Sequence, residues 1–140
     1  MIFGIGTDIS KVSRFEKWVN NPGIFQRFFN EAEIKDSGTI ASRCEHYAAR
    51  FAAKEAFSKA LGTGICGFEL KDVFITKETS GRPVLNVCGT ARDALEKKIS
   101  EMSGLENPDY SLFVSLSHEK EYAIAFVVIE YMEKRLYANR

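Results

Sequence analysis

The sequence predicts a single α+β domain in which a mainly antiparallel sheet packs on one long helix. Residues 40–61 form an uninterrupted helical stretch, and residues 122–130 alternate as a strand. The turn Thr79-Ser80-Gly81 joins two further strand-like segments into a hairpin. A chain of 140 residues is long enough to bury a core of its own. We therefore assign residues 1–140 to one domain.

The remaining elements follow in order along the chain. Residues 1–9 alternate as a strand, and Ser10 is expected to cap a helix that extends to Val19. A short helical piece at 24–29 precedes Asn30 and Glu33, whose spacing suggests a capping box. The C-terminal half then contains the strands 72–78 and 82–87, a helix over 90–102, the strands 112–117 and 122–130, and a charged tail over 131–140.

The first strand has one bare face. Successive side chains alternate across a strand, so Gly4, Gly6 and Asp8 share a face. Two glycines beside an acid allow a ligand or a second backbone to approach this face closely.

Composition excludes several classes of function. The 19 basic residues balance the 19 acidic ones, so no net charge points to nucleic acid or to a membrane surface. Cys44, Cys66 and Cys88 form no CxxC pair, and no signal-like apolar stretch opens the chain. These features favour reduced thiols in a cytoplasmic protein over a disulfide framework or a zinc site.

The long helix carries a carboxylate, that of Glu55, on a face that is otherwise mostly small or apolar. Its residues 48–61 are small or apolar on almost all sides, which is typical of a buried helix. At about 3.6 residues per turn, Glu55 shares a face with Ala48, Ala52 and Lys59. Its carboxylate is costly to bury without a compensating cation or donor. Lys59, four residues on, can pair with it along the helix.

Three sequence blocks together resemble the holo-acyl-carrier-protein synthase family of phosphopantetheinyl transferases. They occur in the family's order and span most of the chain. The blocks are GIGTDI at residues 4–9, RFAAKEAFSKALGTGI at residues 50–65 and SLSHEKEYAIA at residues 115–125. The resemblance implies the 4'-phosphopantetheinyl transferase fold. It also implies transfer of 4'-phosphopantetheine from coenzyme A to a serine of apo acyl carrier protein, in fatty acid biosynthesis.

The same resemblance implies a set of site residues. Asp8 and Glu55 would be ligands of Mg²⁺, which usually takes one or two carboxylates together with substrate phosphates. Lys59 would neutralise phosphate charge, and Glu55 is the candidate for the base that activates the serine. The residues expected to border coenzyme A are Arg50, Lys59, Gly62, Thr63, Gly64, Arg82, Pro83 and His118.

Partners follow from the resemblance as well. Carrier proteins of this pathway are acidic around the modified serine, so we expect Arg14 and Arg27 to dock them. The family forms homotrimers. A chain of this length would need a neighbouring subunit to complete its cleft. The strand 122–130, which is apolar on both faces, suits burial between subunits.

Two alternatives remain open on the residues alone. The same scaffold could perform a different magnesium-dependent phosphoryl or nucleotidyl transfer, which would need no acidic carrier. Alternatively, the chain could be a non-enzymatic oligomeric binding domain in which Glu55 and Lys59 form an ordinary helical salt bridge.

Overall fold

A three-stranded antiparallel sheet covers one side of a long central helix. The computed structural model describes residues 1–133, so most of the expected charged tail lies outside the described residues. The helices and strands are β1 (Ile2–Lys11), α1 (Glu16–Val19), α2 (Pro22–Phe28), α3 (Ile40–Leu61), β2 (Val73–Lys77), β3 (Pro83–Val87), α4 (Gly89–Ser103), β4 (Tyr110–His118) and β5 (Tyr122–Tyr131). Three short 3₁₀ helices, Val12–Phe15, Glu31–Glu33 and Leu70–Asp72, lie between them.

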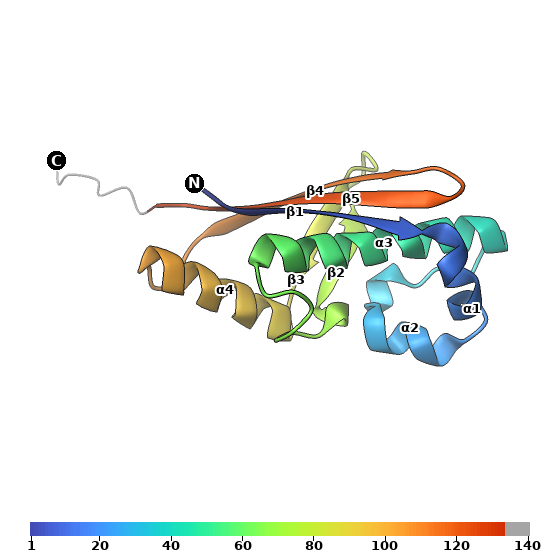
Figure 1. Cartoon of the computed structure of the whole chain (residues 1–140), viewed down its shortest axis with the longest axis horizontal. Helices are drawn as coiled ribbons and strands as arrows, with labels where there is room; N and C mark the ends of the chain where they lie inside the picture. Colours follow the sequence, from blue (N-terminus) through green and yellow to red (C-terminus); the bar gives the residue numbers. More distant parts are fainter. Residues whose placement is uncertain (134–140) are drawn as a thin grey trace.

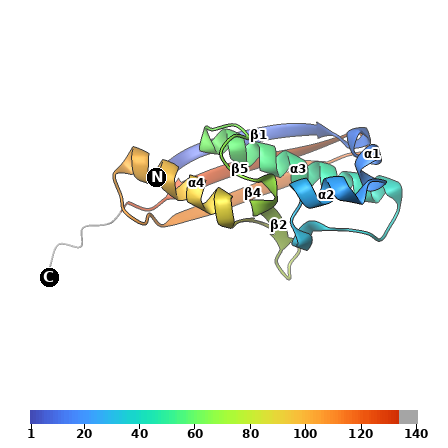
Figure 2. The same cartoon turned by 90° about the horizontal axis from the view of Figure 1, so that it is seen from below.

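The strands form two antiparallel sheets. The larger has the order β1-β5-β4, and β2 pairs with β3 in the smaller one. Figure 1 shows the three long strands along one side of α3, with α4 and α2 near opposite ends of the helix on its other side. Figure 2 shows the same arrangement from below, with α2 and α4 in front of α3. The predicted α+β fold is confirmed.

The central helix begins and ends where the sequence predicts. The Thr39 hydroxyl accepts a hydrogen bond from the Ser42 amide at 3.0 Å, which caps the first turn. Gly62 ends the helix with a φ of 86°, a left-handed conformation that glycine adopts at little cost. Most of the helix between these caps is buried, as its small and apolar residues require.

The bare face of β1 packs directly on α3. A Cβ atom added at Gly6 would lie 1.9 Å from the Ala56 carbonyl oxygen, and one at Gly4 would lie 1.9 Å from that of Ala60. Only glycine permits this approach, so these two residues set how closely β1 lies against α3. The sequence interpretation of this face is confirmed, with α3 as the second backbone.

The expected helix from Ser10 to Val19 begins later than predicted, although it ends at Val19 as expected. Ser10 remains in β1, where it pairs with Ala123, and its side chain is buried. The chain leaves the strand only after Lys11, through the 3₁₀ helix Val12–Phe15. Strand pairing with β5 therefore overrides the local capping preference of serine. The capping box at Asn30 and Glu33 is present, on the 3₁₀ helix Glu31–Glu33.

The outer face of the large sheet is apolar and exposed. In β5, Ala123, Ala125 and Val127 are fully buried against the core, as alternation requires. The opposite face carries Ile124 and Phe126, which are 45% and 44% exposed. Its exposed neighbours on β1 and β4 include Ile5, Ile9 and Phe113. A contiguous apolar surface of this kind marks an interaction site.

Candidate active site

Asp8 and Lys59 meet where β1 crosses α3. The Lys59 ammonium lies 3.1 Å from Asp8 Oδ1 and donates a second hydrogen bond to the Thr7 carbonyl oxygen at 3.0 Å. The Asp8 side chain is 18% exposed, whereas that of Lys59 is 55% exposed. The close approach at Gly6 brings the strand near enough for this contact. The helical salt bridge between Glu55 and Lys59, one of the alternatives above, is absent from the described residues, because Lys59 reaches across to β1 instead.

Glu55 is the third member of this group. It is half-buried on α3, one turn before Lys59. Burial raises the pKa of its carboxyl group, and the negative charge of Asp8 raises it further. Lys59 and Arg14 act in the opposite direction. The two carboxylates are therefore close enough to repel each other, and the Lys59 ammonium only partly offsets the repulsion.

The donor set of this group fits magnesium. Hard cations prefer carboxylate oxygens, and Mg²⁺ typically takes one or two from the protein and the rest from phosphates and water. Among the described residues, no cluster of three or more His, Cys, Asp or Glu side chains could enclose a metal by itself. Two repelling carboxylates with open surroundings suit a cation that is shared with a phosphate-bearing substrate. Asp8 and Glu55 are the residues that would hold it.

A second group lines an open pocket of about 360 Å³ between α3, the β2–β3 hairpin and the end of β4. Arg50, Pro83 and His118, which the family resemblance implies would border coenzyme A, all lie here. Arg82 does not line this pocket, although both of its chain neighbours do. Lys35 and Lys77 add two positive charges to the lining, and Glu45 is the only acidic residue in it.

The buried guanidinium of Arg50 has a free donor that could bind an anion. Its side chain is 8% exposed, and its Nε has no hydrogen-bond partner among the described residues. One Nη atom donates to the His46 carbonyl oxygen at 3.3 Å. Burial lowers the pKa of the guanidinium, and a buried cation of this kind requires a compensating charge. The negative charge of Glu33 partly offsets the effect of burial, and an anion in the pocket would add to it.

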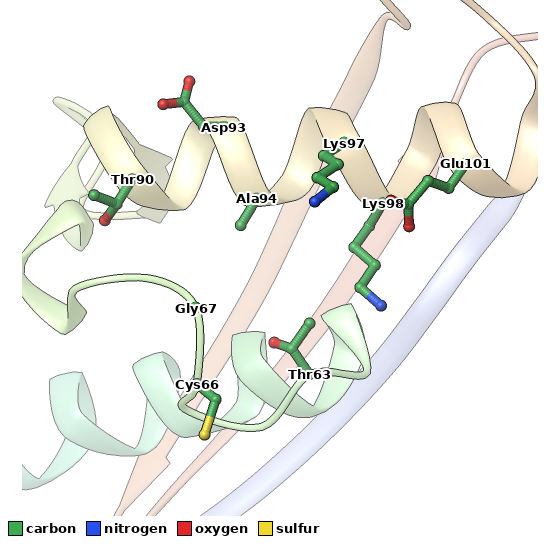
Figure 3. Close-up of a pocket in the computed structure, with 9 residues that line it drawn as sticks. All are labelled: Thr63, Cys66, Gly67, Thr90, Asp93, Ala94, Lys97, Lys98 and Glu101. Atoms are coloured by element: carbon green, nitrogen blue, oxygen red, sulfur yellow. The ribbon is translucent and has the colours of Figure 1, made fainter.

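The turn after α3 forms a third region. Thr63 lines a cavity of about 440 Å³ together with Cys66, Gly67 and residues of α4. Figure 3 shows Lys97 and Lys98 extending from α4 toward this turn. Gly62 and Gly64 have φ values of 86° and 64°, a left-handed conformation that suits glycine, and neither adds a side chain beside Thr63.

The predicted site residues therefore divide between two sides of α3. Arg50 and Lys59 are nine residues apart, which is about two and a half turns, so they point in opposite directions and are separated by about 13 Å along the axis. Asp8, Glu55 and Lys59 lie on the side of β1, whereas Arg50 and His118 lie on the other. A ligand that contacts both Arg50 and Lys59 of one chain must therefore reach about 13 Å along the helix and around it.

Comparison with known proteins supports the same assignment. The model of the 4'-phosphopantetheinyl transferase superfamily matches residues 4–127. The chain belongs to this superfamily. A curated holo-[acyl-carrier-protein] synthase from Treponema denticola is 46% identical over 135 residues, which cover 93% of this chain and 99% of the relative.

Solved structures of the superfamily show the same fold. The holo-[acyl-carrier-protein] synthase of Neisseria meningitidis is 32% identical with a TM-score of 0.72, over 93% of this chain and 99% of that one. The Helicobacter pylori enzyme, solved in complex with coenzyme A, is 31% identical with a TM-score of 0.69, over 90% and 99% of the two chains.

The two arginines predicted to dock a partner lie on one aromatic surface of this superfamily member. The Arg14 guanidinium lies 5.2 Å from the centre of the Phe51 ring, and that of Arg27 lies 5.6 Å from that of Phe28. Trp18 stacks on Phe28 and contacts Phe51 edge-on, which joins the two arginines through aromatic contacts. Both arginine side chains are exposed. Arg14 also lies close enough to Glu55 to lower its pKa, so this surface borders the carboxylate group.

Sequence reasoning missed a buried ion pair behind the site. Lys54 and Glu33 are 2.6 Å apart and almost fully buried. Lys54 precedes Glu55 in the matched block, but nothing in the sequence indicates its partner 21 residues away. His46 belongs to none of the three matched sequence blocks. Its ring lies 2.6 Å from the Glu33 carbonyl oxygen, and burial lowers its pKa to about 4.

No described helix is long and apolar enough to cross a membrane.

Proposed function

We propose that this chain transfers 4'-phosphopantetheine from coenzyme A to a serine hydroxyl of an apo acyl carrier protein, with Mg²⁺ as the required cation. The observation that carries the proposal is the group of Asp8, Glu55 and Lys59 at the crossing of β1 and α3. These residues occupy the matched blocks of a superfamily whose curated relatives bear this activity in their names.

Each residue of this group has a distinct role in the proposed transfer. The serine oxygen attacks the β-phosphate of coenzyme A, the bond to the bridging diphosphate oxygen breaks, and adenosine 3',5'-bisphosphate leaves. Magnesium, when bound, supplies positive charge to the diphosphate. Lys59 adds a fixed ammonium beside the same oxygens. Glu55 accepts the serine proton, directly or through water.

The pocket around Arg50 suits the nucleotide half of coenzyme A. The free Nε of its guanidinium, with Lys35 and Lys77, offers cationic donors for a phosphate, and His118 adds a ring nitrogen beside them. Pro83 provides an apolar wall beside them. This pocket and the carboxylate group would together hold the nucleotide of coenzyme A, which carries a 3'-phosphate as well as the 5'-diphosphate.

Because these two groups lie on opposite sides of α3, a second copy of the chain would place them on the same ligand. We propose a homotrimer in which the Lys59 side of one subunit faces the Arg50 side of the next. The exposed outer face of the large sheet supports this assembly, since Ile124 and Phe126 would be buried between subunits. A closed ring of such unlike contacts repeats the same site at each interface.

The acidic carrier would dock on Arg14 and Arg27. Their aromatic neighbours hold the two guanidinium groups in place, and positive charge at an interface steers an acidic partner. Arg14 lies near Glu55, so a carrier bound there would present its serine to the carboxylate group. Function in fatty acid biosynthesis and location in the cytoplasm are part of the same proposal.

The decisive experiment is a mass spectrum of purified apo acyl carrier protein after incubation with this protein and coenzyme A. We expect a gain of one phosphopantetheine group with magnesium, and none with chelator or with the Glu55→Ala variant. Glu106→Gln, a change in the exposed loop after α4 and outside every proposed site, serves as the control and should remain active. If folded protein with magnesium modifies none of several apo carriers, the proposal is wrong and a binding domain becomes the better interpretation.

A further inference from the structure

Lys54 is a charged residue with almost no exposed surface. Its side chain is 1% exposed, and its ammonium donates hydrogen bonds to three separate elements. The acceptors are Glu33 Oε1 at 2.6 Å, the Leu70 carbonyl oxygen at 3.0 Å and the Val73 carbonyl oxygen. An ammonium has three donors, so Lys54 is fully satisfied.

The Glu33 carboxylate is also hydrogen-bonded through both of its oxygens. Besides Lys54, its carboxylate accepts hydrogen bonds from the Asn30 amide and from the Ile75 amide, each at 3.1 Å. These contacts tie the 3₁₀ helix Glu31–Glu33 and the strand β2 to the same point on α3. Removal of either member would leave the other charge buried and unpaired, which is strongly destabilising.

This pair holds α3 on the side opposite the glycine contact. At about 100° per residue, Lys54 and Ala56 lie about 200° apart around the helix. Ala56 is the residue whose carbonyl oxygen Gly6 approaches. Glu55 lies between them, so the direction of its side chain depends on contacts that hold the helix from both sides.

We propose that Lys54 is a positioning residue, which together with Glu33 fixes the rotation of α3 about its axis and so directs Glu55 toward Asp8. The inference rests on the proposed magnesium site. Lys54 is buried away from solvent and has all its donors occupied, so it would act through Glu55 rather than on a substrate.

Small rotations are sufficient to disturb such a site. A helix with its side chains is about 10–12 Å wide, so a rotation of about 20° would move the Glu55 carboxylate by about 2 Å. Magnesium requires ligand distances of about 2.0–2.1 Å in near-octahedral geometry. A misplacement of about 1 Å in a catalytic group can cost about 100-fold in rate.

The test compares direct metal binding in three variants, measured as Mn²⁺ affinity by electron paramagnetic resonance in the presence of coenzyme A. Lys54→Met removes the ammonium. The double variant Glu33→Leu with Lys54→Met replaces both charges by apolar side chains, a change that can leave stability unimpaired. The control is a variant of Ile99, which is buried on α4 and away from the metal site. Of Ile99→Val and Ile99→Ala, we use the one whose thermal midpoint is nearer to that of Lys54→Met. It reports the effect of lost stability alone.

We expect both Lys54 variants to bind Mn²⁺ at least about tenfold more weakly than the wild type, and the Ile99 variant to bind normally. If a folded double variant binds Mn²⁺ as tightly as the wild type, the positioning role is wrong. If the double variant does not fold, Lys54→Met is compared with the Ile99 variant of equal midpoint, and equal affinities overturn the inference. Carrier modification by the wild type is measured in parallel, because its failure would refute the proposed function and not this inference.

Discussion

The Lys59 ammonium bridges α3 to β1, at 3.1 Å from Asp8 Oδ1 and 3.0 Å from the Thr7 carbonyl oxygen. It is therefore not the helical partner of Glu55. In this position it offsets the charge of Asp8 while more than half of its side chain stays exposed. A cation at Asp8 and the Lys59 ammonium would compete for the same carboxylate.

Replacement of Lys59 by methionine should separate turnover from metal binding. We expect kcat to fall about 100-fold to 1000-fold, the usual effect of losing a group that stabilises transition-state charge. The magnesium concentration for half-maximal activity should not rise, because the competing ammonium is gone. Steady-state kinetics at several magnesium concentrations measure both quantities. An unchanged kcat would exclude Lys59 from the reaction.

Glu55 should make the metal-free protein less stable as the pH rises. Its carboxyl pKa is raised above the usual 4.5, so the folded state holds this proton more tightly than the unfolded state. The resulting stability is present below pH 4.5 and is lost as the pH rises through the folded pKa. Metal-free Glu55→Gln should therefore have a higher thermal midpoint than the wild type at pH 7, with a smaller gain at pH 4 to 4.5. A lower midpoint for Glu55→Gln at pH 7 would contradict the assignment.

The docking surface can be tested without disturbing the chemistry. Arg27→Gln should raise KM for an acidic carrier protein about fivefold to tenfold and weaken its salt dependence, with little change in KM for coenzyme A. Arg14→Gln should do the same and also shift the pH profile of kcat upward, because Arg14 lowers the pKa of Glu55. Lys71→Gln, exposed on the 3₁₀ helix Leu70–Asp72, is the matched control. Equal effects of all three variants would argue against a specific surface.

Mixing of two inactive variants should restore activity if sites form between subunits. Lys59→Met and Arg50→Gln damage opposite sides of α3, so a site between one subunit of each kind can be intact. Random 1:1 exchange in a trimer should restore about one quarter of the wild-type sites. The measurement is carrier modification after joint refolding, with each variant refolded alone as the control. A mixture no more active than the average of the two variants would place the whole site within one subunit.

The sequence predicted those elements whose signals are local. The bounds of α3 follow from Thr39, Gly62 and the small residues between them. The capping box needs only Asn30 and Glu33. The bare face of β1 was recognised from its glycines, and the structure identifies α3 as the backbone that approaches it.

The features that sequence reasoning missed depend on contacts between distant residues. Ser10 has the local preference of a helix cap, but its pairing with Ala123 keeps it in β1. Lys59 could equally have paired with Glu55, and only the crossing of β1 over α3 places Asp8 within its reach. The partnership of Lys54 with Glu33 likewise requires the folded chain.

The glycines of β1 have a consequence for how this protein tolerates mutation. Gly4 and Gly6 do not have positive φ angles, so an alanine at either position would suit the backbone and still collide with α3. In a deep mutational scan these two positions should be as intolerant as Asp8, although neither has a functional group. A ranking of residues by mutational sensitivity alone would therefore assign Gly4 and Gly6, which only set the distance between β1 and α3, to the active site with Asp8.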